Sequence, residues 1–115
     1  MAGNYRLKID QGTTIERPLR WTRDGLPVDL TGATARMEIR DKAGGTLIHR
    51  LDTENGGITL GGVTGTILLI IAAEVSSAWT ARAAVYDLEV VEATGKVSRL
   101  IEGAVTISAE VTTGG

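Results

Sequence analysis

The chain has 115 residues, of which 43% are hydrophobic and only 3% aromatic, and phenylalanine is absent. This length allows one domain with a core of its own, built from Ile, Leu, Val and Ala, and such side chains suit β-sheets. The net charge of −2 gives no attraction to nucleic acid or to an anionic membrane, and the absence of cysteine excludes disulfides, thiolate metal sites and cysteine nucleophiles.

The first forty residues predict three strands. Residues 5–9 alternate between apolar and polar side chains, as in a half-buried strand. A second strand covers residues 15–21, where Arg17 breaks the alternation and Pro18 removes a ladder donor, which predicts an edge strand or a bulge. Residues 35–40 alternate cleanly and form the clearest short strand.

The middle of the chain contains an unusually apolar strand. Residues 46–52 form a strand of ambiguous phase because their apolar side chains fall on both faces, and residues 58–60 form a short strand. Residues 66–72 are apolar on both faces. Because one face of an antiparallel sheet is usually solvated, this last strand is either central and covered, or it presents one face to another subunit.

A short helix and a long hairpin complete the chain. Apolar residues at helical spacing predict a helix of about two turns over residues 73–82, which is a connector rather than a layer. Residues 84–91 and 97–111 alternate as two strands joined by a tight turn. The phase of the second strand slips only at Arg99 and Leu100, which predicts a β-bulge there.

About eight short strands with a turn every eight to twelve residues are typical of a β-sandwich or barrel. We therefore predict an all-β fold, an antiparallel β-sandwich of the immunoglobulin-like class, with one short helix near residues 73–82. Tyr86 follows that helix at the start of a long hairpin, a position similar to a tyrosine corner. A single domain covers residues 1–115, with 113–115 as a flexible tail.

The polar residues form no recognisable catalytic or ligand-binding constellation. His49 is the only histidine and reads as a plain strand residue, because acid–base work and metal binding both need partners. Residues 52–57 lack the ligand alternation of a calcium loop and read as a polar turn. Ser76 and Ser77 have no base in a known motif. We expect no enzymatic activity, no cofactor, no metal and no small-molecule substrate.

Several residues are candidates for contacts between subunits. Asp87 and Glu89 share one face of a strand, where they are either solvated or paired with arginine on a neighbouring strand or subunit. Arginine is three times as frequent as lysine, which reflects either coding bias or planar, bidentate contacts at an interface. The candidate interface residues are Arg17, Leu68, Ile70, Asp87, Glu89, Arg99 and Leu100.

The order of turns and strands resembles a known family. The features are Asp10-Gln11-Gly12, the run from Asp24-Gly25 through Pro27-Val28-Asp29-Leu30-Thr31-Gly32, Asn55-Gly56-Gly57-Ile58, Tyr86-Asp87-Leu88-Glu89-Val90, and Arg99-Leu100-Ile101 before Gly103. Together they cover nearly the whole chain and are similar to small tail and baseplate structural proteins of tailed phages and prophages, including the N-terminal domain of baseplate upper proteins.

The resemblance implies a non-enzymatic virion component of the tail, baseplate or fibre-attachment region. It would be made in the cytoplasm of the bacterial host and present in several copies, in contact with other tail or fibre proteins and with neither nucleic acid nor membrane. A cyclic assembly with heterologous contacts is expected. Two alternatives remain open at this point: a soluble carbohydrate-binding β-sandwich and a capsid decoration protein.

Overall fold

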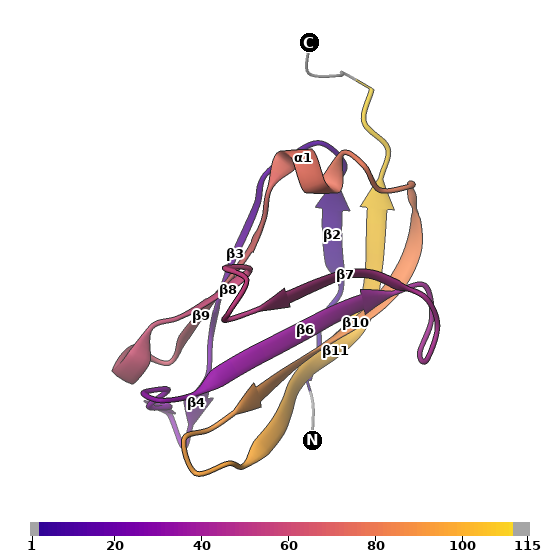
Figure 1. Ribbon diagram of the computed structural model, residues 1–115. Coiled ribbons are helices and arrows are strands. Elements are labelled where there is room, and N and C mark those ends of the chain that lie inside the picture. The colour runs from indigo at the N-terminus through magenta and orange to yellow at the C-terminus, as the bar shows by residue number, and fades with distance from the viewer. Residues whose placement is uncertain (1–2, 112–115) are drawn as a thin grey trace.

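Two β-sheets lie face to face in the computed structural model, which describes residues 3–111 (Figure 1). The larger sheet has the order β7 (Leu47–Asp52), β6 (Thr34–Arg40), β10 (Arg82–Val91) and β11 (Val97–Ser108). The free side of β11 pairs with β1 (Gly3–Asn4) and β2 (Leu7–Asp10). The smaller sheet has the order β3 (Ile15–Arg20), β9 (Thr66–Ile71) and β8 (Ile58–Leu60).

Short elements close the two ends of the sandwich. A two-residue hairpin of β4 (Thr22–Arg23) and β5 (Leu26–Pro27) follows β3, and the 3₁₀ turn η1 (Gly62–Thr64) joins β8 to β9. At the opposite end, the helix α1 (Ala73–Ser76) connects β9 to β10 (Figure 1). Within residues 3–111, no helix has the length and apolar composition needed to cross a membrane.

The strand order is that of an immunoglobulin-like sandwich. The smaller sheet corresponds to strands B, E and D, and the larger sheet corresponds to G, F, C and C′ of the variable-type fold. The predicted fold class is therefore confirmed. One detail of it is wrong: β1 and β2 run parallel to β11, so the larger sheet is mixed rather than purely antiparallel.

Alternation along the strands builds the core between the sheets. In β6 and β10, every second residue is buried, and the intervening residues point outward. Because the inward residues are mostly aliphatic, the core needs few aromatic rings. The buried hydrophobic residues are Leu7, Ile9, Ile15, Val28, Leu30, Ala35, Met37, Ile39, Leu51, Ile58, Ile67, Leu69, Ile71, Ala84, Tyr86, Leu88, Val90, Val105 and Ile107.

Two β-bulges explain the irregular phases in the sequence. Between β10 and β11, Leu88 pairs with Ile101 and Glu89 pairs with Arg99, so Leu100 is the extra residue, as predicted. A second register shift between β6 and β7 leaves Ile48 without a partner. This second bulge is why the apolar residues of 46–52 fall on both faces.

The predicted helix is too long. The α-helix covers only Ala73–Ser76, and the backbone then continues through turns to Trp79. Side chains from the β2–β3 turn fix this connector: Gln11 Nε2 donates to the carbonyl of Trp79, and Gly12 N donates to Ser76 Oγ at 3.1 Å. Contacts with a distant turn thus end the helix where its apolar spacing alone would continue it.

The predicted similarity of Tyr86 to a tyrosine corner is wrong, because its hydroxyl group binds a different part of the backbone. A tyrosine corner bonds to backbone a few residues upstream. Here the Tyr86 hydroxyl donates to the carbonyl of Tyr5 at 2.6 Å, on the segment between β1 and β2. The bond therefore fixes the N-terminal segment to the larger sheet. The predicted flexible tail, 113–115, lies outside the described residues.

Candidate functional site

The predicted interface residues fall on three different surfaces. The outer face of the larger sheet carries Asp87, Glu89 and Arg99. The outer face of the smaller sheet carries Leu68 and Ile70. The open side between the two sheets carries Arg17 and Leu100. The structure thus does not bring the seven residues together into one site.

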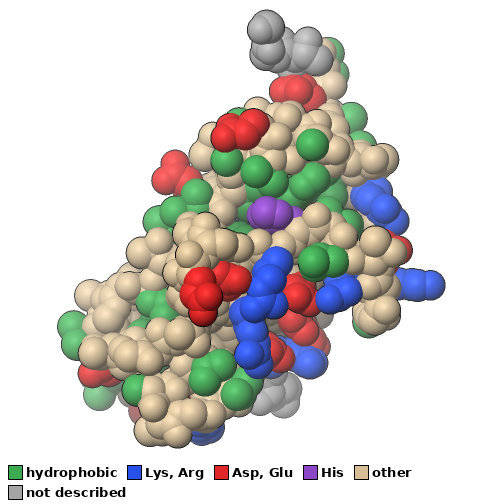
Figure 2. Space-filling model, in the orientation of Figure 1, with side chains coloured by type: hydrophobic (Ala, Val, Ile, Leu, Met, Phe, Trp, Pro, Cys, Tyr) green, Lys and Arg blue, Asp and Glu red, His purple; other side chains and the backbone are tan. Residues whose placement is uncertain are grey.

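Ion pairs cover the outer face of the larger sheet. Figure 2 shows basic and acidic side chains side by side on one face of the molecule. Arg36 Nε lies 2.8 Å from Glu89 Oε1 and joins β6 to β10. Arg99 Nε lies 3.5 Å from Asp87 Oδ2 and joins β11 to β10. Of the two interpretations of Asp87 and Glu89, pairing with arginine on a neighbouring strand is therefore confirmed.

The carboxylates of this face differ in how well they are stabilised. Hydrogen bonds from Arg40 and Arg50 hold the pKa of Glu38 below its usual value. Burial raises the pKa of Asp87, and the nearby carboxylates of Glu89 and Glu102 add to the rise, whereas Arg99 opposes it. The charged form of Asp87 is thus less well stabilised than that of Glu38, although both carboxylates lie beside a guanidinium group.

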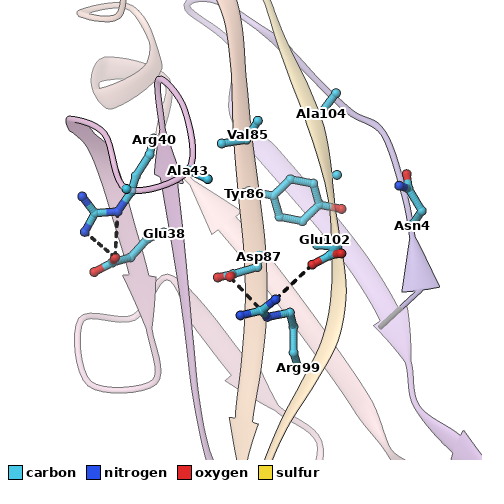
Figure 3. A pocket seen from close by; sticks show the side chains of 12 residues that line it. Asn4, Glu38, Arg40, Ala43, Val85, Tyr86, Asp87, Arg99, Glu102 and Ala104 are labelled. Atoms are coloured by element: carbon cyan, nitrogen blue, oxygen red, sulfur yellow. Dashed lines mark hydrogen bonds and ion pairs between the residues drawn. The ribbon is translucent and has the colours of Figure 1, made fainter. Parts of the chain in front are cut away.

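A hollow of about 610 Å³ lies on this face, between β6, β10 and β11 (Figure 3). Its two guanidinium groups are already bound: Arg40 contacts Glu38, and Arg99 contacts Asp87 and Glu102. The hollow therefore offers no unpaired guanidinium group to a ligand, and two of its carboxylates share one arginine. Within residues 3–111, no group of three or more His, Cys, Asp or Glu side chains has a metal-binding arrangement.

The outer face of the smaller sheet is more apolar. β9 is its central strand, and Ile67, Leu69 and Ile71 point into the core, where they are buried. Leu68 and Ile70 point outward and remain partly exposed. β9 is therefore central, but only its inner face is covered by the second sheet.

The residues beside Leu68 and Ile70 complete this outer face. Leu68 pairs with Pro18 of β3 and Thr59 of β8, and Ile70 pairs with Glu16. Arg20 pairs with Thr66 at the end of β3. An apolar centre thus lies between one acidic and one basic side chain of the same strand.

The open side between the sheets carries Arg17 and Leu100. Strand β3 is an edge strand, as Pro18 predicted. Arg17 shares the inward face of β3 with Ile15, and Arg17 Nη1 donates to the hydroxyl of Tyr5 at 2.9 Å. Leu100 is partly buried and packs against the core, so only part of its side chain is accessible.

The remaining polar candidates have structural roles. His49 is half-buried and lies against Trp79, with ring centroids 5.4 Å apart, and burial lowers the pKa of His49. Asp52 Oδ1 accepts hydrogen bonds from the backbone amides of Glu54 and Asn55, which confirms a polar turn. Ser76 is fully buried and binds backbone groups, a role that the sequence did not indicate.

Comparison with known proteins finds no family and no curated protein that matches this sequence. Among solved structures, CopC from Methylosinus trichosporium OB3b is similar at 14% identity and a TM-score of 0.50, over 94% of this chain and 90% of that chain. The extracellular domain of the voltage-gated sodium channel beta4 subunit is 11% identical at a TM-score of 0.48, over 96% of each chain. At such identities the likeness to CopC concerns the β-sandwich fold alone.

Proposed function

We propose that this protein is a non-enzymatic structural component of a tailed-phage virion, in the tail, baseplate or fibre-attachment region. It acts through contacts with copies of itself and with neighbouring virion proteins. The observation that carries this proposal is the pair of partly exposed aliphatic side chains, Leu68 and Ile70, on the outer face of the smaller sheet. The proposed position in the virion follows from the resemblance of the turn and strand order to phage tail proteins.

The argument rests on the contrast between the two outer faces. The outer face of the larger sheet is polar and carries paired charges, as expected for a solvated face. The face around Leu68 departs from that pattern with aliphatic side chains and Pro18 at its centre. Covering such a surface is worth about 25 cal/mol for each Å² of apolar area removed from water. An apolar centre with a polar rim is the usual anatomy of a protein interface.

The charges beside this centre suit a second copy of the chain. On β3, Glu16 and Arg20 point outward on either side of Pro18. If two copies meet face to face with their β3 strands antiparallel, Glu16 of each copy lies beside Arg20 of the other. Such a contact is self-complementary, as a two-fold interface requires, and it therefore differs from the heterologous contact that the resemblance led us to expect.

Light scattering after size-exclusion chromatography tests the contact. We expect an oligomeric mass for the wild-type protein at high micromolar concentration and a monomeric mass for Leu68→Asp and for Ile70→Asp, because each buries a charge in the interface. Leu47→Asp is the matched control: Leu47 is 44% exposed on β7, a strand of the larger sheet, and the same charge there should leave the mass unchanged.

Thermal melts separate loss of assembly from loss of folding. Each aspartate variant should melt cooperatively as a monomer with the circular dichroism spectrum of a β-protein. A wild-type protein that is monomeric at high micromolar concentration, and that binds immobilised glycans, would contradict the structural function in favour of a carbohydrate-binding module.

A further inference from the structure

One side chain covers part of the edge of β7 that faces away from β6. In the described part of the chain, β7 pairs with β6 only, so no strand lies along its outer edge (Figure 1). Asn55, in the turn after β7, takes that place. Asp52 N donates to Asn55 Oδ1 at 3.0 Å, and Asn55 Nδ2 donates to the carbonyl of Arg50 at 3.0 Å. The side-chain amide of Asn55 is thus the edge cap of β7.

The two hydrogen bonds of the edge cap have the pattern of a parallel β-ladder. In such a ladder, a residue donates to a carbonyl of the neighbouring strand and accepts from the N–H two positions further along. Asn55 does the same on either side of Leu51. Because unpaired N–H and C=O groups at a sheet edge are a template for pairing with another chain, the edge cap blocks such pairing at Arg50 and Asp52.

The turn that carries the edge cap is fixed to both sheets. Asn55 N donates back to Asp52 Oδ1 at 2.7 Å, and Gly57 N donates to Asn55 Oδ1 at 2.8 Å. The carbonyl of Gly57 accepts from Ile70 N of β9 at 2.8 Å. A Cβ at Gly57 would lie 2.8 Å from Leu51 Cβ, so the turn lies directly against β7. These contacts hold the amide of Asn55 in place.

The residue after Asn55 gives this asparagine a chemical liability. Asn55 is exposed, and Gly56 has φ 82° with nothing within 4 Å of where a Cβ would lie. In an Asn-Gly pair, no side chain shields the glycine nitrogen from the asparagine Cγ, and the glycine backbone adapts easily. Asparagine is a thermolabile residue for this reason. Asn4, the other asparagine of the chain, precedes the bulky Tyr5.

We propose that Asn55 is a deamidation site that the folded structure protects, and that its modification removes the edge cap of β7. The backbone nitrogen of Gly56 attacks Cγ of Asn55. The N–Cγ bond forms, the Cγ–Nδ2 bond breaks, and Nδ2 leaves as ammonia with the proton of the Gly56 N–H. Water then opens the cyclic imide at either carbonyl and leaves aspartate or isoaspartate at residue 55.

The folded structure slows the first step. Asn55 Oδ1 accepts two N–H groups, and Nδ2 is held by the carbonyl of Arg50, so Cγ is not free to meet the nitrogen of Gly56. The turn must open before the ring can close. Because opening breaks three hydrogen bonds, the folded chain should react about tenfold more slowly than the unfolded chain.

Neither product restores the edge cap. In isoaspartate, the former Cγ belongs to the main chain, so the group that paired with β7 is no longer a side chain. In aspartate, the carboxylate has no donor for the carbonyl of Arg50, and it adds a negative charge beside Asp52. The reaction therefore frees a strand edge irreversibly. The site is separate from the face around Leu68, so the inference does not depend on the proposed function.

Peptide mass spectrometry of the full chain tests the modification. In mildly alkaline buffer, the peptide that contains Asn55 should gain the mass of an NH₂ group replaced by OH, and part of it should be a substrate for isoaspartyl methyltransferase. The same chain unfolded in urea should react about tenfold faster. No conversion in urea, equal rates in the two states, or conversion of Asn4 as fast as that of Asn55 in urea would each overturn the proposal.

Hydrogen exchange tests the loss of the edge cap. The amides of Asp52 and Gly57 both donate to Asn55 Oδ1, so both should exchange about tenfold faster in the purified isoaspartyl form and in Asn55→Ala. Glu54→Ala is the matched control: Glu54 is exposed in the same turn, and its replacement removes no bond of the cap. Wild-type exchange at Asp52 in the isoaspartyl form would overturn the uncapping, and so would equal exchange in Asn55→Ala and Glu54→Ala.

Discussion

Removing one buried hydroxyl should destabilise the whole domain. Ser76 is 0% exposed, and its Oγ accepts a hydrogen bond from Gly12 N at 3.1 Å and donates one to the carbonyl of Thr13 at 3.0 Å. Ser76→Ala leaves this N–H and this carbonyl without the partner that the fully buried side chain of Ser76 supplies. Leaving a buried polar group unsatisfied costs about 1 to 3 kcal/mol.

The assay is chemical denaturation with a thermal melt. For a domain of this size, 1 kcal/mol lowers the melting temperature by roughly 4 °C, so Ser76→Ala should melt about 4 to 12 °C below the wild type. Ser77→Ala is the matched control, because Ser77 is exposed and its Oγ bonds only to the carbonyl of Glu74 in the same turn. Its free energy of unfolding should change by less than about 0.5 kcal/mol.

The two serine variants can also refute the reasoning. If Ser76→Ala unfolds with the same free energy as Ser77→Ala, the hydroxyl does not hold the β2–β3 turn to α1. If both variants lose 3 kcal/mol or more, the α1 segment as a whole, rather than the buried hydrogen bonds, determines the stability.

Three further predictions concern the turns and the titratable groups. Gly65 has φ 71°, and a Cβ there would lie 2.6 Å from the carbonyl oxygen of Trp21, whereas a Cβ at Gly25, with φ 79°, would meet nothing within 4 Å. In chemical denaturation, Gly25→Ala should therefore lower the free energy of unfolding by about 1 kcal/mol, and Gly65→Ala should lower it clearly more. Equal losses would contradict the close approach of Trp21 to Gly65. Burial raises the pKa of Tyr86 to about 12, so the folded state keeps a proton that the unfolded state releases near pH 10; the free energy of unfolding should fall between about pH 10 and 12, and Tyr86→Phe should remove that part of the fall. Because Arg40 and Arg50 lower the pKa of Glu38, stability should decline as the pH falls below the ordinary glutamate range, and a Glu38→Gln variant with the same acid profile would exclude this contribution.

Where apolar and polar residues alternate cleanly, the pattern predicted which face of the strand is buried. The phases of residues 35–40 and 84–91 matched the burial of β6 and β10. The slip at Arg99 and Leu100 located a bulge, because an extra residue reverses the phase of everything that follows it. These features are local, so the sequence contains their signal directly.

Long-range partners left no comparable signal. The alternation in residues 5–9 does not reveal that β2 lies parallel to β11, since a side-chain pattern shows faces and not neighbours. The helix ends early because Gln11 and Ser76 make contacts across more than 60 residues. Likewise, the bond from Arg17 to Tyr5 joins β3 to the segment between β1 and β2, two parts of the chain whose contact no local pattern shows. Of the candidate surfaces, only the outward positions of Asp87 and Glu89 followed from the pattern, because residues 66–72 are apolar on both faces.

Mass spectrometry of purified virions tests the proposed function most directly. Particles are induced from the bacterial strain that carries the gene and banded by density. We predict peptides of this chain in intact particles at a fixed ratio to the tail proteins, and their loss from tailless heads. Absence of the chain from the particles would contradict the proposed function, and its retention on tailless heads would place it on the capsid instead.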